Sequence, residues 1–292
     1  MILIRECRGF DELQACVDLQ IEVWGYSDGD VIPRRVFLVS QKIGGQVIGA
    51  FDTEIRDEGS GGSEDGHAGA LIGFSFSLPG LKTGAKSASG RPEPYLHSHM
   101  LAVRDGYRNQ QIGARLKLAQ REDALKRGFE RIEWTFDPVE IKNSFLNIHK
   151  LGAIVRTYEE NFYGVSSSRL QGGLQTDRLL AEWWIRTPRV EAAIQGDAPL
   201  ALNENGLRDG LLEIRVPAAI YRWKAEDSER HLAQQVQAEN RRRFQQAFSQ
   251  GLAVVAFTRD EDGNGTFHLG RWAEPSSRIA SSSESLQIAA LQ

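Results

Sequence analysis

The side chains best suited to proton transfer lie on a short stretch of alternating polarity, residues 95 to 103. His97 and His99 are two positions apart, so both imidazoles are expected on one face of a strand. A neutral imidazole can accept a proton from an ammonium near neutral pH, which makes both histidines candidate general bases. The competing interpretation is a polar network within the core. The alternation predicts two faces, namely Tyr95, His97, His99, Leu101 and Val103 against Leu96, Ser98, Met100 and Ala102.

The turn that follows this strand has the features of an anion site. It carries the run Arg108, Asn109, Gln110, Gln111, Ile112, Gly113 and Ala114. Backbone N–H groups in the first turn of a helix have no intrahelical acceptor and the helix dipole favours an anion there, so a pyrophosphate would be well placed. Gly113 is expected to let a bulky ligand approach the helix closely, and Arg108 supplies a planar cation. Neither GxxxxGK[ST] nor GxGxxG occurs, so the usual motifs of nucleotide hydrolysis and dinucleotide binding are missing.

The elements on both sides of this turn form a strand, a helix and a second strand. The helix is expected to begin near Gln111 and to stop at Gly128, and the second strand covers residues 129 to 136. Such a unit is by default a right-handed parallel crossover. Glu133 on the second strand is another candidate base, and a solvated or ion-paired carboxylate is the alternative reading of it.

The preceding part of the chain predicts a strand and two helices before a pair of strands. Asp11 is a candidate N-cap for the first helix, and Pro33 suits the start of the second. The stretch 57–69 is expected to be a mobile hairpin loop, and 79–94 either a lid or a plain connection. The predicted strands are 2–6, 46–54 and 70–78, and the second helix is 34–42. After Pro138 we expect a helix over 140–151 and strands over 153–159 and 178–186.

The pattern changes after residue 187. A loose polar stretch to about 210 precedes a strand at 211–217, a helix at 227–250, and a hairpin of two strands, Leu252–Thr258 and Thr266–Arg271. Arg241, Arg242 and Arg243 on this helix are interpreted as a solvated face, with a nucleic-acid contact as the lesser alternative. The predicted domains are therefore 1–187, a smaller C-terminal α/β unit at 188–274, and a frayed Ser-rich tail at 275–292.

Composition excludes several classes of protein. With 292 residues and 41% hydrophobic content the chain can fill a core, while a formal charge of -4 gives no basic field for nucleic acid or an anionic membrane. Cys7 and Cys16 lack the spacing of a metal site, so neither structural zinc nor a disulfide scaffold is expected, and a reducing cytoplasm fits best. No signal peptide or membrane span is predicted.

The turn and its strand resemble the signature of the GNAT superfamily of acyl-CoA-dependent acyltransferases. Leu101, Ala102 and Val103 match its Leu-Ala-Val, and Arg108-x-x-Gln111-Ile112-Gly113 matches its second half, with Gln111 where a glycine is usual. The chain also resembles one branch of that superfamily, through the segments around Asn143, Asn147, Lys150-Leu151-Gly152-Ala153, Asn161-Phe162-Tyr163-Gly164, Thr176-Asp177-Arg178-Leu179 and Glu182-Trp183. The resemblance covers residues 1 to 186.

This resemblance implies a fold and a cofactor. The fold is an α/β (α+β) one, a mixed, mostly antiparallel twisted sheet with splayed central strands flanked by helices. Acetyl-CoA or a related acyl-CoA would be the co-substrate, with its pantetheine arm bonded to the backbone at Leu101 to Val103 and its diphosphate on residues 108 to 114. A backbone N–H would polarise the thioester, and the amine would attack directly.

The resemblance also implies where the acid should lie. Family members place a tyrosine on the helix after the fifth strand to protonate the thiolate, but Ile148 stands there. Tyr158 and Tyr163 are candidate substitutes, with packing aromatics as the alternative. Asn143 and Asn147, four apart on one helix face, could bind the pantetheine amide or the acceptor, or could serve only capping and solvation.

These features predict an N-acyltransferase for a small-molecule amine, such as an amino acid. A succinyl-CoA-dependent amino acid N-succinyltransferase, a catalytically silent acyl-CoA sensor, and a partner-binding protein that has lost the cofactor are the alternatives. The acceptor pocket is expected from loops at 25–33, 79–94 and 165–177. No metal, nucleic acid or membrane partner is expected, and a homodimer stays open.

Overall fold

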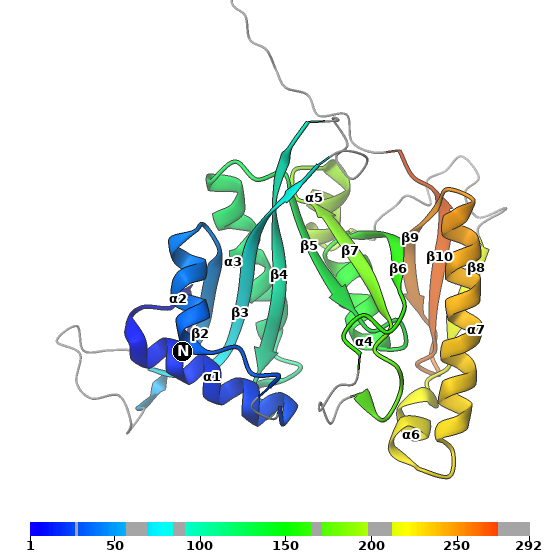
Figure 1. Ribbon diagram of the computed structural model, residues 1–292, viewed down its shortest axis with the longest axis horizontal. Helices are drawn as coiled ribbons and strands as arrows, with labels where there is room; N and C mark the ends of the chain where they lie inside the picture. Colours follow the sequence, from blue (N-terminus) through cyan, green and yellow to red (C-terminus); the bar gives the residue numbers. More distant parts are fainter. Residues whose placement is uncertain (27–28, 57–68, 84–90, 165–170, 198–211, 274–292) are drawn as a thin grey trace, which may run out of the picture.

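A single twisted sheet organises the chain. The computed structural model describes residues 1–26, 29–56, 69–83, 91–164, 171–197 and 212–273, and within them ten strands follow one another in the order β1-β2-β3-β4-β5-β7-β6-β9-β10-β8 (Figure 1). β4 and β5 are parallel, and the other neighbouring strands are antiparallel. The expected mixed, mostly antiparallel sheet is therefore confirmed.

The strands have the following bounds: β1 Ile2–Glu6, β2 Gln46–Arg56, β3 Gly69–Lys82, β4 Glu93–Val103, β5 Arg131–Phe136, β6 Ile154–Glu159, β7 Arg178–Trp184, β8 Leu212–Val216, β9 Leu252–Arg259 and β10 Gly265–Arg271. The longer helices are α1 Gly9–Trp24, α2 Arg34–Lys42, α3 Ile112–Lys126, α5 Pro188–Gln195 and α7 Arg230–Ser249. Shorter turns are η2 Asp105–Tyr107, α4 Ile141–Ser144, the π-helical η3 Phe145–Lys150, and α6 Ile220–Ala225.

The first four strands are covered on both faces. α1 and α2 pack on one face, where Leu13 and Phe37 join Phe74 and Phe76 of β3 in a buried cluster. α3 packs on the other face, through Leu116 and its neighbours. This two-sided burial explains the long apolar runs of β2 and β3, since both faces of these strands lie against helices.

Several sequence-based boundaries shift. α1 begins at Gly9, two residues before Asp11, and no side chain caps it, so the predicted N-cap is wrong; Asp11 lies in the first turn, where its charge complements the helix dipole. The stretch 79–94 is not all loop, because β3 runs to Lys82, which pairs with Glu93 of β4. Residues 57–68, 84–90, 165–170 and the tail from 274 lie outside the described residues, as do the loop predictions made for them.

The C-terminal part contains two helices that the sequence pattern missed. α5 occupies the start of the stretch read as loose and polar, with Val190 and Ala193 buried, and α6 precedes α7. β9 joins the N-terminal strands through the pair Val155–Val254, and one buried cluster contains Trp183 of β7 and Phe267 of β10. The predicted division at residue 187 thus falls within a continuous sheet.

Candidate functional site

The site forms where β4 and β5 separate. Their parallel pairing is limited to Leu96–Ile132 and His97–Glu133. Beyond these pairs, β4 continues against β3 and β5 continues against β7, and Figure 1 shows the two ribbons diverging. Within the described residues, the edge of β4 after His97 therefore has no neighbouring strand on the β5 side, and such an edge can pair with an extended ligand.

A β-bulge lies at the point of divergence. Phe76 pairs with Met100 and the next β3 residue, Ser77, pairs with Ser98, so His99 is the extra residue of β4. Beyond the bulge the side chains change faces: Met100 joins the core under α1 and α2, while Leu101 lies against α3. The predicted single alternation over residues 95–103 is wrong for this reason, because one inserted residue reverses the phase of the strand.

The two histidines lie close together at the bulge. Their ring centroids are 6.1 Å apart, and His99 is edge-on to Phe76. Burial lowers the pKa of His97 to about 4, with the positive charges of His99, Lys117 and Lys82 adding to the effect. Burial alone lowers the pKa of His99. Both imidazoles are therefore neutral near pH 7, and His97 is a weak base.

Glu133 is engaged in an ion pair. Its side chain is 2% exposed, and its Oε2 lies 2.7 Å from Lys82 Nζ, with Arg131 Nε 3.3 Å from Oε1. Burial raises the pKa of Glu133, while the bond from Lys82 opposes that rise. The geometry matches the ion-paired alternative, since the carboxylate has a cation on each oxygen.

The turn before α3 presents unbonded backbone N–H groups. The first intrahelical bond runs from Arg115 N to Gln111 O, and no side chain caps the helix. In the part of the chain that the structure describes, the N–H groups of Ile112, Gly113 and Ala114 have no acceptor. Such groups at a helix N-terminus fit the diphosphate of an acyl-CoA.

Two residues of this turn have left-handed backbone conformations. Asn109 has a φ of 64° and Gln111 a φ of 62°. Gln111 thus adopts the conformation that a glycine would take without a steric cost, which explains how the chain forms the turn with Gln111 at a position where the GNAT signature, which the sequence resembles, has a glycine. Strain of about 1–3 kcal/mol per residue persists where the surrounding structure fixes the backbone, and it often marks functional sites.

The side chains of the turn differ from expectation in two respects. Arg108 Nη2 lies 2.7 Å from Asp105 Oδ1, so its guanidinium is held by a carboxylate of the same turn. A Cβ added to Gly113 would lie 3.4 Å from Leu101 Cδ2, which is an ordinary van der Waals contact, so the packing of α3 on β4 does not by itself require a glycine here. Gln110 donates to Gly106 O. Ala102 and Ile112 are core residues and could take part only through their backbone.

The two asparagines differ in burial. The helix changes to π-helical geometry at Phe145, and Asn143 is exposed while Asn147 is 4% exposed. The alternative of helix-surface solvation therefore fits Asn143 and does not fit Asn147. Ile148 is fully buried in the main cluster, consistent with a core role at that position.

The two tyrosines lie in different places. Tyr158 is on β6, two strands from β5; its ring stacks on Phe244, and its hydroxyl donates to Asp177, with burial as the first cause of a raised pKa. The structure therefore separates it from the histidines. The Tyr163 hydroxyl lies 2.9 Å from Thr135 Oγ1, on the diverging part of β5.

Tyr163 has other neighbours that the sequence did not reveal. The guanidinium of Arg178 lies 5.2 Å from its ring centroid, and the Tyr163 phenol contributes to the raised pKa of Tyr26, which is caused first by burial. Tyr26 stacks on Trp24 at the end of α1. Tyr26 and Tyr163, which adjoin two of the loops expected to form the acceptor pocket, are therefore within electrostatic range of one another.

Lys117 was also missed. This α3 residue is 3% exposed; its Nζ donates to Ser98 Oγ at 2.8 Å and lies 3.6 Å from the Trp134 ring centroid. Burial lowers its pKa well below the usual value. Lys117 lies four residues after Gly113 and next to Leu116, which places it on the inward side of the helix. This spacing is the sequence signal that could have identified Lys117.

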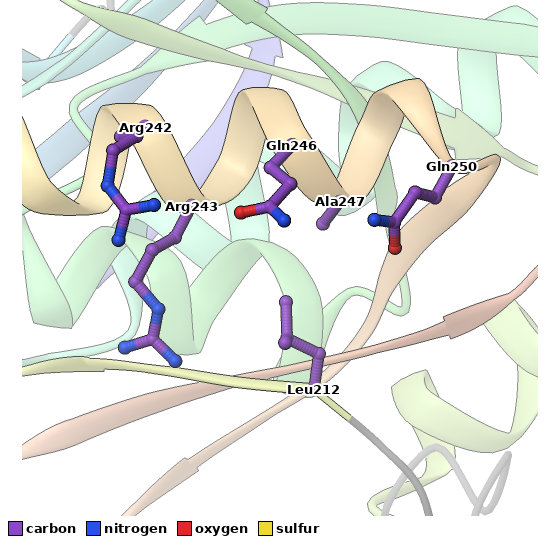
Figure 2. A pocket seen from close by; sticks show the side chains of 6 residues that line it. All are labelled: Leu212, Arg242, Arg243, Gln246, Ala247 and Gln250. Carbon is purple, nitrogen blue, oxygen red and sulfur yellow. The ribbon is translucent and has the colours of Figure 1, made fainter.

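The described residues also bear on metal clusters, membrane spans and surface hollows. Among the described residues, no three His, Cys, Asp or Glu side chains gather as metal ligands would. No helix in the described ranges is long and apolar enough to cross a membrane. A hollow between α7 and β8 lies away from β4 and contains none of the candidate residues; its lining is Leu212, Arg242, Arg243, Gln246, Ala247 and Gln250 (Figure 2).

The features that the resemblance implied are now present together. One parallel pair lies in a mostly antiparallel sheet, the two strands diverge beyond it, and an uncapped helix follows the first of them. These features agree with the GNAT-type fold that the sequence resemblance implies. No protein-family model matches the sequence, and no curated protein matches it.

Several solved structures that are similar to this chain carry the name acetyltransferase. The ribosomal-protein-S18-alanine N-acetyltransferase from Escherichia coli is 13% identical, with 64% of this chain and 96% of that chain covered and a TM-score of 0.44. Arabidopsis thaliana NAA60 in complex with acetyl-CoA is 15% identical, with 64% and 100% covered and a TM-score of 0.49. An N-acetyltransferase from Staphylococcus aureus Mu50 is 12% identical, with 64% and 99% covered and a TM-score of 0.44. At these identities the likeness concerns the fold alone.

Proposed function

We propose that this protein is an N-acyltransferase that transfers an acyl group from acetyl-CoA or a related acyl-CoA to the amine of a small molecule, such as an amino acid. The observation that carries the proposal is the divergence of β4 and β5, with unbonded N–H groups of α3 at the end of β4. An open strand edge fits an extended pantetheine, and the helix N-terminus fits its diphosphate.

Each residue group has a role in this reaction. The backbone of Leu101 to Val103 binds the pantetheine, and the backbone of residues 109 to 114 binds the diphosphate, with Arg108 beside it. The acyl-CoA supplies an activated thioester carbonyl. The backbone at the His99 bulge lies beside that carbonyl, where an N–H would stabilise developing negative charge.

The chain also offers a base and an acid. The neutral His99 imidazole takes a proton from the substrate ammonium and so frees the amine that attacks, because burial keeps the ring unprotonated near pH 7. The C–N bond forms as the C–S bond breaks, and the Tyr163 hydroxyl gives its proton to the thiolate from its position on Thr135. The second proton that the nitrogen loses as the amide forms restores the Tyr163 hydroxyl. His97 lies next to His99 and is the weaker base.

The test combines binding with turnover. Melting temperature is measured with acetyl-CoA, succinyl-CoA and free CoA, because a ligand of the folded state must stabilise it. Acyl transfer is then assayed over a panel of amines and amino acids, with His99→Ala and His97→Ala as variants. We expect stabilisation by at least one acyl-CoA and loss of turnover in His99→Ala. No stabilisation by any of the three would refute the proposal, and the two acyl-CoAs distinguish acetyl from succinyl transfer.

A silent acyl-CoA sensor is the second candidate. The observation in its favour is the buried Ile148, at the position where the family signature has the acid tyrosine. Binding of acetyl-CoA or succinyl-CoA without turnover of any amine in the panel would support this function.

A further inference from the structure

The connection between β6 and β7 begins with residues 160–164, the first stem, and ends with residues 171–177, the second stem. These two stems bond to one another. Phe162 N donates to Thr176 O, and Tyr163 N donates to Thr176 Oγ1 at 3.0 Å. The N–H and hydroxyl of Thr176 in turn donate to Asn161 Oδ1. Asn161 has a left-handed φ of 46°, a conformation that its neighbours must hold in place. These bonds fix the backbone of residues 161 to 163.

A side chain of α7 ties the two stems together. Arg241 Nε donates to Asp177 Oδ2 at 2.9 Å, and its Nη2 donates to Asp177 Oδ1 at 3.1 Å. Its Nη1 donates to Glu160 Oε1 at 2.5 Å, and its Nη2 also bonds Gln175. One guanidinium thus contacts the first stem through Glu160 and the second through Gln175 and Asp177.

Asp177 is the centre of this contact. Its side chain is fully buried, and it accepts bonds from the Tyr158 hydroxyl and from Asn161 N as well as the two from Arg241. A buried carboxylate is stable only when its oxygens are bonded, so removal of Arg241 leaves a desolvated charge with half its donors. Asn161 in the first stem donates its N–H to the same Asp177 carboxylate that Arg241 holds.

The neighbouring arginines of α7 have different surroundings. Arg242 is 65% exposed and pairs with Glu239 of its own helix, while Arg243 donates to Glu213 O on β8. The expectation of a solvated face therefore fits Arg242 and is wrong for Arg241, whose side chain is 19% exposed.

We propose that Arg241 is a positioning residue: through Asp177 and the Asn161–Thr176 bonds, it holds the Tyr163 hydroxyl against Thr135 on the diverging part of β5. This inference rests on the proposed function, in which Tyr163 gives a proton to the thiolate. The C-terminal unit thereby has a role in the reaction, because Arg241 of its longest helix, α7, anchors the two stems beside the acyl-transfer site.

The test compares Arg241→Met with Arg242→Met, two adjacent substitutions on one helix. Hydrogen–deuterium exchange of amides in 160–164 and 171–177 is expected to rise in Arg241→Met and to stay at the wild-type level in Arg242→Met. With acetyl-CoA and the best amine of the panel, kcat of Arg241→Met should fall about 10- to 100-fold, as expected for misplacement of a reacting group by about 1 Å. The Kd for acetyl-CoA should change less than about twofold.

Further variants keep the test decisive. If Arg241→Met does not fold, Arg241→Lys keeps the charge without the planar fork, and a smaller rise in exchange is expected from it. Tyr163→Phe should lower kcat by a similar factor, and adding it to Arg241→Met should cost less than the product of the two single effects, because both act through one hydroxyl.

The outcomes separate the inference from the function on which it rests. Exchange and kcat in Arg241→Met equal to those of Arg242→Met would overturn the inference, and so would an equal loss of acetyl-CoA affinity and kcat. If the wild-type protein bound no acyl-CoA, the proposed function would fail, and exchange alone would still show whether Arg241 anchors the stems.

Discussion

Replacement of the buried lysine of α3 should make the protein more stable. Lys117 has one acceptor among the described residues, Ser98 Oγ, and one aromatic face, Trp134. An ion in a protein interior loses several kcal/mol of hydration. The bond to Ser98 returns about 1 kcal/mol and the contact with the indole about 2 kcal/mol. Methionine has a similar length and no charge, so Lys117→Met is expected to raise the free energy of unfolding by about 1–2 kcal/mol at neutral pH.

The effect should depend on pH with a definite sign. Burial depresses the pKa of Lys117 in the folded protein, while the unfolded chain has a lysine pKa of about 10.4. Between these two values the unfolded state binds more protons, so wild-type stability rises with pH, and the destabilising contribution is complete only below the folded pKa. The gain from Lys117→Met should therefore be largest at low pH and should shrink as the pH approaches 10.

Urea unfolding at pH 6, 8 and 9.5 measures this difference, with unchanged slopes as a check on the denatured state. The melting temperature should rise by about 2–8 °C at pH 7. Lys126→Met is the matched control, since Lys126 is 70% exposed on the same helix and should change stability by less than about 0.5 kcal/mol. A variant less stable than the wild type, or a gain that does not vary with pH, would show that the amine is not an unfavourable buried charge.

Three further predictions concern the proposed site. His99→Ala should lower kcat about 100- to 10,000-fold. Because burial lowers the pKa of His99, wild-type activity should persist below pH 6.5 and be lost as the pH falls through that pKa. A pH–rate profile of His99→Ala with the same loss of activity at low pH would contradict this role. Gln111→Gly should relieve the left-handed backbone strain and raise the melting temperature, whereas Gln111→Val should lower the melting temperature by about 2–8 °C. A glycine variant that melts below the wild type in calorimetry would refute the presence of strain at Gln111. Arg108→Ala should weaken acetyl-CoA binding about 10-fold at low salt, as titration calorimetry can measure, while Asp105→Ala should strengthen it by freeing the guanidinium; equal affinities in both variants would exclude Arg108 from the phosphate site.

Elements with strong end signals were predicted well from the sequence. The bounds of α2 agree with expectation, because Pro33 precedes the helix and Gly44 and Gly45 follow it. The turn before α3 was also located, since a Leu-Ala-Val strand and an apolar-spaced helix define its ends. By contrast, α5 is only eight residues long, and its core contacts come from Val190, Ala193 and the partly buried Ile194, too short a run to produce a clear periodic pattern.

The contacts within the site were harder to predict. A bulge changes no residue type, so His99 left no trace in the alternation of β4. The Thr135–Tyr163 bond joins residues 28 apart, and the Arg241–Asp177 bonds join residues 64 apart. Neither separation has a periodicity that a sequence pattern could reveal. Arg241 looked like its two neighbours because only the rotation of α7 against β6 decides which arginine faces inward.

The shared cluster that joins Trp183 of β7 to Phe267 of β10 determines how the molecule comes apart on heating. Neither half can expose its side of that cluster while the other remains intact, because each would leave large aromatic rings in water. Calorimetry should therefore record no separate endotherm for the β9–β10 hairpin. An acyl donor attached near α3 would then delay the melting of β10 together with that of β5, since Ala124 of α3 and Ile132 of β5 belong to the same cluster.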